Sequence, residues 1–315
     1  MKLIKKALFK NLIFLISLFI KPRANTWAVS ISSGGGSRFA ENCISFAEFL
    51  KSKKVKLYVI SNIKLNKFNS EHTTPFSIKY IKALIYSKNL VVENDLHNDM
   101  PAYRSLGTFK INLFHGLALK KIYYSSKFIK KLFKKNIINY LRKFIVGFCF
   151  PQEYDLITTS NKLHKKKYIQ AFENKNVEIF FQPRNCNLIK YNHNLSLKLK
   201  IKKKYQIKEK KKIITYLPTF RDTDPFQKEC ILSSNKNFQN FLIKNKLLFI
   251  YKNHHFYKNN NIKENKINES KKNIYNFTDS EILTQELLLI TDLLITDYSG
   301  VYFDFLLLEK PIIFY

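Results

Sequence analysis

The stretch Leu293–Tyr315, LLITDYSGVYFDFLLLEKPIIFY, combines a short apolar run, a polar loop, a longer apolar run and a second short one. The first run is partly β-branched, which predicts a buried strand, and VYFDFLLLEK has the length and leucine content of a helix. Pro311 ends that helix, and IIFY predicts the next strand. This alternation is typical of parallel α/β sheets. Ligands in such sheets bind beyond the carboxyl ends of the strands, where the loop Thr296–Gly300 is expected.

The same alternation runs through the rest of the chain. TWAVSIS, CISFAEFLKSK and KLYVIS predict an opening strand, helix and strand, with GGGSRFAEN as the loop after the first strand. Further strands are expected at NLVVEN, FKINLFH, YDLITTS and VEIFF, and then at KIITYLP, KLLFIYKNH, DLLIT and IIFY. Amphipathic helices are expected in 122–150 and an exposed loop in 257–272. The fold class predicted is therefore α/β, with two Rossmann-like domains facing each other across a cleft.

Composition narrows the class of protein. A chain of 315 residues with 45% hydrophobic and 15% aromatic residues is globular and long enough for two domains. The formal charge of +32 indicates an anionic partner, namely nucleic acid, an acidic membrane surface or a phosphorylated substrate. A chain-wide lysine bias is an equal alternative explanation. Nucleic acid is not expected, because the chain has no RNA- or DNA-binding motif. Its four cysteines show no C-x-x-C spacing, which favours a reducing compartment without disulfides or structural zinc.

The first 22 residues, MKLIKKALFKNLIFLISLFIKP, combine lysines with an apolar run of about ten residues, shorter than the roughly 20 that span a bilayer. Lysines beside leucine and phenylalanine favour a helix lying in the membrane interface. An ordinary buried first helix and a signal sequence are the alternatives. The expected organisation is an interface helix in 1–22, domains in 23–187 and 213–315, and a Lys-rich linker in 188–212.

Polar residues with catalytic or anion-binding chemistry follow several predicted strands. His115 and Gly116 end INLFHG, with Lys120 further on, and a histidine at a strand end can serve as a general base. Its alternative is a structural histidine in a turn. Thr219 and Arg221 follow KIITYLP and could bind a phosphate, with a capped turn as the alternative.

Two further strand ends add to this set. Lys252 and His254 follow LLFIY and suit a diphosphate, although solvent-exposed charge is the default for such residues. In the TDYSG loop, the amides of Ser299 and Gly300 would open a helix, and a helix N-terminus attracts anions. Asp304, one turn on, could accept hydrogen bonds from a ribose hydroxyl or serve only as a helix N-terminal carboxylate.

These segments, in this order, resemble the CDP-glycerol glycerophosphotransferase family, which makes teichoic-acid and related capsule polymers. The resemblance rests on TWAVSISSGGGSRFAEN, NLFHGLALKK, FFQPRNCNL, YLPTFRD, YKNHHF and LLITDYSGVYFDFLLLEKPIIFY. It implies a two-domain GT-B fold, a location at the cytoplasmic face of the membrane and an active site without metal. The implied reaction is attack by a hydroxyl of a lipid-linked polymer on the β-phosphorus of CDP-glycerol, which releases CMP. The 23–187 domain would then serve the acceptor, and the 213–315 domain would bind the CDP donor.

The resemblance also implies residue roles. His115 corresponds to the base that takes the proton from the acceptor hydroxyl, and His254 to a second essential histidine at the donor phosphates. Positions that correspond to substrate contacts, or that lie beside them, are Gly116, Lys120, Arg184, Thr219, Arg221, Lys252, Thr296, Asp297, Ser299, Gly300 and Asp304.

The chain departs from the family pattern at several positions. Phe181 and Cys186 replace a glycine and an aspartate of the family, His255 replaces a proline, and Gly300 replaces a serine. Family members continue beyond the final Phe-Tyr, so we expect an incomplete donor domain here. Three alternatives remain beside transfer from CDP-glycerol: a related alditol phosphate such as that of CDP-ribitol, a nucleotide-sugar glycosyltransferase, and an inactive remnant.

Overall fold

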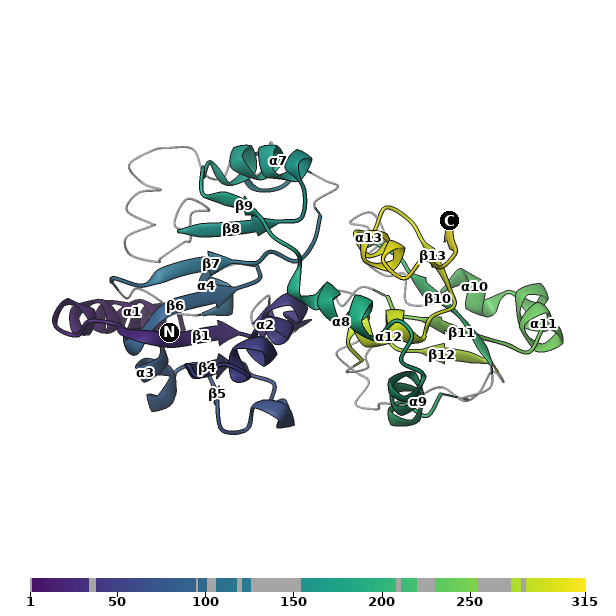
Figure 1. Cartoon of the computed structure of the whole chain (residues 1–315), viewed down its shortest axis with the longest axis horizontal. Coiled ribbons are helices and arrows are strands. Elements are labelled where there is room, and N and C mark those ends of the chain that lie inside the picture. The colour runs from purple at the N-terminus through teal and green to yellow at the C-terminus, as the bar shows by residue number, and fades with distance from the viewer. Residues whose placement is uncertain are drawn as a thin grey trace. The chain divides into compact units, whose positions relative to one another are not determined.

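A computed structural model describes residues 2–33, 38–94, 96–100, 106–117, 121–125, 154–207, 211–219, 230–253, 273–278 and 282–315. The amphipathic helices expected in 122–150 fall largely outside these residues, and the loop expected in 257–272 falls wholly outside them. The chain forms two compact units, Met1–Arg184 and Asn185–Tyr315 (Figure 1). The division lies in the first turn of helix α8 (Pro183–Tyr191).

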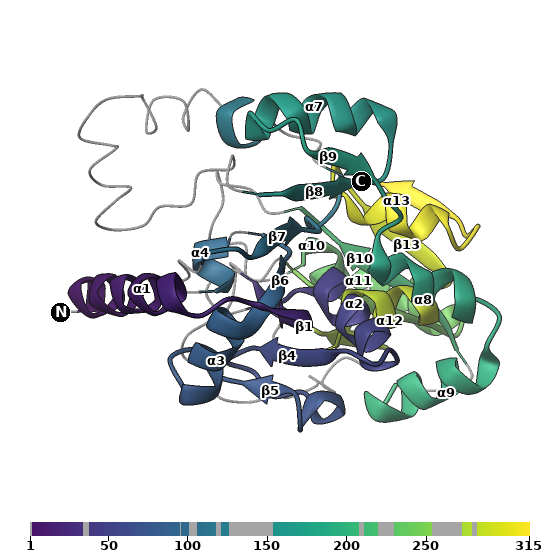
Figure 2. The same cartoon turned by 60° about the vertical axis from the view of Figure 1, so that its left-hand side comes forward.

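The first unit is built around a parallel sheet of seven strands in the order β5-β4-β1-β6-β7-β8-β9 (Figures 1 and 2). Its strands are β1 (Arg23–Ser30), β4 (Lys56–Ile60), β5 (His72–Thr73), β6 (Ser87–Val92), β7 (Phe109–Asn112), β8 (Leu156–Thr159) and β9 (Val177–Ile179), with an antiparallel pair β2 (Ser32–Ser33) and β3 (Arg38–Phe39). Its helices are α1 (Lys2–Phe19), α2 (Glu41–Lys51), α3 (Ile78–Tyr86), α4 (Leu96–Asp99) and α7 (Lys162–Phe172), with 3₁₀ turns at Asn66–Phe68 and Tyr123–Ser125.

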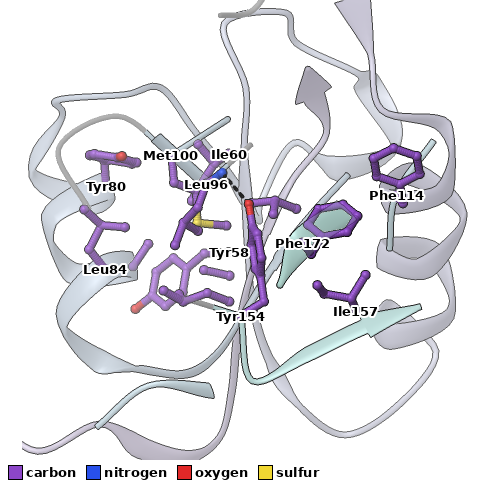
Figure 3. Packing of buried hydrophobic residues seen from close by; sticks show 14 of the residues in the cluster. Tyr58, Ile60, Tyr80, Leu84, Leu96, Met100, Phe114, Tyr154, Ile157 and Phe172 are labelled. Atoms are coloured by element: carbon purple, nitrogen blue, oxygen red, sulfur yellow. Dashed lines mark hydrogen bonds between the residues drawn. The ribbon is translucent and has the colours of Figure 1, made fainter. Parts of the chain in front are cut away.

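Alternation along the strands sends side chains into two layers. Trp27 of β1 packs edge-on against Phe46 of α2, with ring centroids 5.7 Å apart. The next residue, Ala28, joins a cluster with residues of α1, α3 and α7. Figure 3 shows part of this cluster, in which Tyr154 lies between the α3 side chains and the group around Phe114. The Tyr154 hydroxyl accepts a 3.0 Å hydrogen bond from the backbone amide of Leu96. The hydroxyl therefore has a hydrogen-bond partner although the tyrosine is buried.

The second unit contains a parallel sheet of five strands in the order β12-β11-β10-β13-β14. The strands are β10 (Lys212–Leu217), β11 (Leu247–Tyr251), β12 (Ile274–Asn276), β13 (Leu293–Thr296) and β14 (Ile312–Phe314). The helices are α9 (Leu195–Lys204), α10 (Ile231–Ser234), α11 (Lys236–Lys244), α12 (Thr284–Ile290) and α13 (Val301–Leu306), with most of α8. In both sheets the first strand of the unit is internal and later strands add on its two sides, as in Rossmann folds.

Both faces of the second sheet are covered. Ile213 and Leu217 of β10 face a cluster that includes residues of α8, α9, α12 and α13, whereas Ile214 and Tyr216 face one with Leu242 of α11. The segment 188–212, which was expected to be a linker, therefore contributes to this core. Leu188 and Ile201 are buried in it, and α9 lies beside α12 (Figure 2).

Helix α1 has one packed face and one exposed apolar face. Ile13 is fully buried in the first unit, and α1 contacts α3. The opposite face exposes Leu8, Leu12, Leu15 and Leu18 by about half of their surface or more. The segment thus forms a helix that packs on the first unit and leaves an apolar face exposed, and its placement in a membrane interface stays a prediction. Among the described residues no helix has both the length and the apolar content needed to cross a bilayer.

Candidate active site

His115 lies on a tight turn just after β7, next to the strand β6 at which the order of the first sheet reverses. The residues before and after His115 both have positive φ, +51° for Phe114 and +138° for Gly116. Phe114 is 3% exposed, and its ring lies 4.3 Å from the half-buried imidazole. A non-glycine residue with positive φ costs conformational energy and persists only where its surroundings hold it.

The surroundings bind every residue of this turn through its backbone. Asn112 Oδ1 accepts a 2.8 Å bond from the Phe114 amide, and Asn42 Nδ2 donates to the Phe114 carbonyl at 2.7 Å. Arg184 Nη1 donates to the His115 carbonyl at 2.8 Å. The hydroxyl of Tyr168 donates to the Gly116 carbonyl at 2.6 Å. The turn therefore holds its strained shape through side chains from three other elements.

Gly116 is required by this arrangement for two reasons. Its φ is one that glycine adopts without steric cost, and a Cβ placed on it would lie 3.1 Å from Nη2 of Arg184. The guanidinium thus packs against the glycine backbone while it binds the adjacent carbonyl. Gly116 and Arg184, both expected as substrate contacts, are brought together with His115, and the contacts described here are with the protein backbone.

The second unit brings together the ends of β10 and β13, the two neighbouring strands at which its sheet order reverses. Ligands of doubly wound sheets bind at this position. Asp297 Oδ1 accepts bonds from the Thr219 amide at 2.9 Å and from the Thr219 hydroxyl at 2.6 Å. Thr296, fully buried, donates its hydroxyl to the Leu217 carbonyl at 2.6 Å. The three expected donor contacts Thr219, Thr296 and Asp297 therefore lie at one strand edge and brace one another.

Residues after Asp297 form a short loop in which Tyr298 is exposed and Ser299 and Gly300 are half-buried. Tyr298 is 82% exposed, and the Val301 amide donates to Ser299 Oγ at 3.5 Å. Gly300 is the N-cap of α13, which ends at Leu306 rather than at Lys310 as the apolar run predicted. Because the helix has fewer than two turns, the macrodipole expected to favour an anion at Ser299 and Gly300 is small.

Asp304 lies in the packed part of the second unit. It is 5% exposed, and its Oδ1 and Oδ2 accept bonds from Asn185 Nδ2 at 2.8 Å and from Gln285 Nε2 at 3.1 Å. Both carboxylate oxygens thus have protein donors, which favours the structural alternative over a ribose contact.

Lys252 follows β11, and its ammonium group donates to the Ile282 carbonyl. The other cationic candidates, Lys120, Arg221 and His254, lie outside the described residues. Within the described part of the chain no three His, Cys, Asp or Glu side chains gather as metal ligands would.

Sequence reasoning missed Asn42 and Tyr168 around the His115 turn, Glu93, which accepts a 2.7 Å bond from the Asn42 amide, and Asn185 and Gln285 around Asp304. Asn42 belongs to the conspicuous segment GGGSRFAEN, and Asn185 follows Arg184 directly, so their motifs held a signal. Asn42 and Arg184 bind the carbonyls of Phe114 and His115 from 72 and 69 residues away, and Asn185 binds Asp304 across 119 residues. Only the tertiary structure reveals such pairings.

Comparison with protein families identifies the chain. The model of the CDP-Glycerol:Poly(glycerophosphate) glycerophosphotransferase family matches residues 14–315. The chain belongs to this family. It is accordingly a transferase, and the resemblance carried by HGLALK, LPTFRD and TDYSG is confirmed.

Individual members of the glycerophosphotransferase family align over most of the chain. The teichoic acid poly(glycerol phosphate) polymerase of Bacillus spizizenii W23 is 30% identical over 92% of this chain and 74% of its own length. The teichoic acid glycerol-phosphate transferase of Staphylococcus aureus is 26% identical over 98% of this chain and 79% of its own.

Among solved structures, that of the wall teichoic acid polymerase TagF superposes with a TM-score of 0.74 at 20% identity, covering 98% of this chain and 74% of that one. The predicted α/β fold of the GT-B type, with two Rossmann-like units, is thereby confirmed.

Proposed function

We propose that this glycerophosphotransferase transfers glycerol phosphate, or a related alditol phosphate, from its CDP-activated form to a hydroxyl of a lipid-linked cell-wall polymer. The acceptor oxygen attacks the β-phosphorus, the bond from that phosphorus to the bridging oxygen breaks, and CMP leaves with the bonding electron pair. The acceptor proton passes to His115 and then to solvent. Products are CMP and a polymer longer by one phosphodiester-linked alditol.

The observation that carries the proposal is the His115 turn. A general base must hold its ring nitrogen within hydrogen-bond reach of the proton that it removes. The half-buried imidazole stands on a turn whose backbone is bound by Asn42, Arg184, Asn112 and Tyr168, which limits its freedom. Such preorganisation suits a phosphoryl-type transfer, in which positioning and charge stabilisation supply most of the rate enhancement.

We place the CDP donor at the strand edge of the second unit. Thr219 and Asp297 lie at the position where the order of the parallel sheet reverses, and the Ser299–Gly300 loop follows directly. Lys252 follows the adjacent strand β11 and adds a cation. The proposal also includes Arg221 and His254, which follow the same strand ends in sequence and would neutralise the diphosphate.

We further propose that the enzyme acts at the cytoplasmic face of an anionic membrane, docked through the exposed face of α1. The side chains Leu8, Leu12, Leu15 and Leu18 share that face at the spacing of one helical stripe. The helix has four lysines and no acidic residue, and so complements anionic headgroups. An apolar stripe beside lysines is the pattern of helices that lie in the membrane interface.

A nucleotide-release assay tests the reaction. Purified protein is given a lipid-linked glycerol phosphate primer with CDP-glycerol, CDP-ribitol or a UDP-sugar in separate reactions. We expect CMP release that depends on the primer and on one of the CDP-alditols. Release of UDP would instead assign a nucleotide-sugar transferase, and absence of release from every donor would refute the proposed reaction.

The variant His115→Ala tests the assigned base within the same assay. We expect it to lower turnover by about 100-fold or more, because general-base catalysis contributes about 10²- to 10⁴-fold. Binding of CDP-glycerol, measured by calorimetry, should be preserved. Near-normal turnover in this variant would remove His115 from the mechanism.

A further inference from the structure

The strongest unexplained feature is the hydrogen-bond shell of the His115 turn, and Asn42 is at its centre. Asn42 is fully buried and uses each of its polar groups except its own carbonyl in contacts between distant segments. Its backbone amide donates to Glu93 at 2.7 Å, its Nδ2 donates to the Phe114 carbonyl at 2.7 Å, and its Oδ1 accepts from the Arg184 amide at 3.1 Å. Through its side chain and its backbone amide, this one residue connects the end of β6, the turn after β7 and the start of α8.

Glu93 makes this connection rigid. It is 1% exposed, and one of its carboxylate oxygens also accepts from the Cys43 amide at 3.3 Å. These two amides belong to the first turn of α2, where free N–H groups and the helix dipole favour a negative charge. Glu93 therefore holds the N-terminus of α2 in place and, with it, the Asn42 side chain.

Tyr168 supports the turn from the other side. Its ring is 1% exposed and packs edge-on against Phe114 with centroids 5.0 Å apart, and its hydroxyl binds the Gly116 carbonyl. Asn42 and Tyr168 thus bind the carbonyls of the residues immediately before and after His115. Neither contact is needed to form the sheet, because the Phe114–Gly116 turn lies beyond the last paired residue of β7.

We infer that Asn42 and Tyr168 are positioning residues for His115, which hold the strained Phe114–Gly116 turn in the shape that presents the imidazole to the acceptor. This inference rests on the proposed function of His115. Arg184 belongs to the same shell through the His115 carbonyl, which gives this residue a contact beside the proposed base, whereas its expected contact with the donor stays a prediction.

Two variants each remove part of the shell without changing any charge. Asn42→Leu keeps the branched shape and the number of side-chain heavy atoms but removes the donor to Phe114 and the acceptor for the Arg184 amide, and Tyr168→Phe removes only the hydroxyl. We expect each to lower kcat about 10- to 100-fold, as displacement of a catalytic group by about 1 Å does, while the KM for CDP-glycerol stays within about twofold. Rates are expressed per donor-binding site, counted by calorimetry.

Matched controls separate positioning from folding. Asn174 is also buried, and its Nδ2 donates to the Tyr154 carbonyl at 2.8 Å. Tyr154 is a second buried tyrosine with a hydrogen-bonded hydroxyl. Asn174→Leu and Tyr154→Phe should therefore destabilise the first unit to a similar degree and retain native kcat.

The pH dependence of kcat provides the readout that lost stability would not change. A smaller fraction of folded enzyme lowers the rate by the same factor at every pH. A displaced imidazole instead changes the apparent pKa of the kcat profile. The charged side chains that the described contacts bring to the turn are Arg184 and, through Asn42, Glu93, and both are intact in the two variants.

The outcomes are distinct. Reduced kcat and a shifted profile in the two variants, with normal controls, support the inference. Native kcat and profile in folded Tyr168→Phe and Asn42→Leu would overturn it, even if His115→Ala is inactive and the proposed function stands. If Asn42→Leu does not fold, Tyr168→Phe alone decides. Native turnover in His115→Ala would refute the proposed base itself.

Discussion

The amide and the hydroxyl of Thr219 both donate to Oδ1 of Asp297, at 2.9 and 2.6 Å. The contact joins the loops that follow β10 and β13. These two strands are neighbours in the sheet, although Thr219 and Asp297 are 78 residues apart in the chain. It fixes the strand edge at which we place the CDP donor.

Asp297→Ala should weaken donor binding. The change leaves the Thr219 amide without this acceptor and releases the two loops from each other. We expect the KM for CDP-glycerol to rise about tenfold, equivalent to about 1.4 kcal/mol and typical of a lost charge-assisted hydrogen bond. Steady-state kinetics of CMP release measures the change.

The control for this variant is Thr215→Val. Thr215 is fully buried in β10, and its hydroxyl lies 2.6 Å from that of Thr291. Its loss should reduce stability by about 1 kcal/mol and leave the KM unchanged. An unchanged KM in Asp297→Ala would contradict the assignment of this edge to the donor.

Asp304→Asn should affect stability more than donor binding. The side-chain amide of the new asparagine has one oxygen and one NH₂ group, so it cannot accept from both Asn185 and Gln285. Its NH₂ group would face the NH₂ group of one of these two residues. We expect the free energy of unfolding to fall by about 1–3 kcal/mol, measured by urea denaturation. Asp292→Asn, on an exposed carboxylate that accepts from the Ile213 amide, is the matched control and should cost less.

A raised KM for CDP-glycerol in folded Asp304→Asn, with unchanged stability, would restore the alternative role of Asp304 as a ribose contact.

Exposed leucines of α1 should govern membrane binding. We expect Leu12→Gln/Leu15→Gln to weaken binding to vesicles that contain phosphatidylglycerol by roughly tenfold or more, because each buried leucine contributes about 1 kcal/mol or more. Cosedimentation measures the partition. Leu163→Gln, on a leucine of α7 that is 62% exposed, is the matched control and should bind as the unmodified protein does. Equal partition of all three proteins would argue against docking through α1.

Lys310 should make stability depend on pH at alkaline values. Its ammonium donates to the carbonyls of Leu289 and Thr291, and burial, followed by the nearby Lys198, lowers its pKa to about 8. Between pH 8 and 10.5 the unfolded chain, with an ordinary lysine pKa, holds more protons at this position than the folded protein does. Stability attributable to Lys310 therefore rises with pH across this window.

The measurement for Lys310 compares the unmodified protein with Lys310→Met by urea denaturation at pH 7.5 and pH 10. The difference in unfolding free energy should shift in favour of the unmodified protein at the higher pH. A difference that is the same at both values would show that the lysine titrates normally.

Strands that coincide with an apolar run were predictable from the sequence, including the three-residue strands β9 and β14, whereas β5 and β12 were not. The segments KIITYLP and DLLIT correspond to β10 and β13, because a run of apolar and β-branched residues is itself the condition for a buried strand. The strands β5 (HT) and β12 (IYN) contain two and three residues and include polar ones, so no apolar run marks them. Helix α13 ends before the end of its apolar run because the chain turns at Glu309, where φ is +55°.

The sequence by itself determined the α/β class, the family and the strand ends that carry His115, Thr219 and Asp297, because these depend on local pattern and on motifs that stand in order along the chain. Tertiary structure alone decided which side chains hold those positions in place. Asn42 and Arg184 form hydrogen bonds to the His115 turn from 72 and 69 residues away in the chain. Asn185 donates to Asp304, which is 119 residues away. Hydrogen bonds between buried groups depend on distance in space, which no local pattern contains.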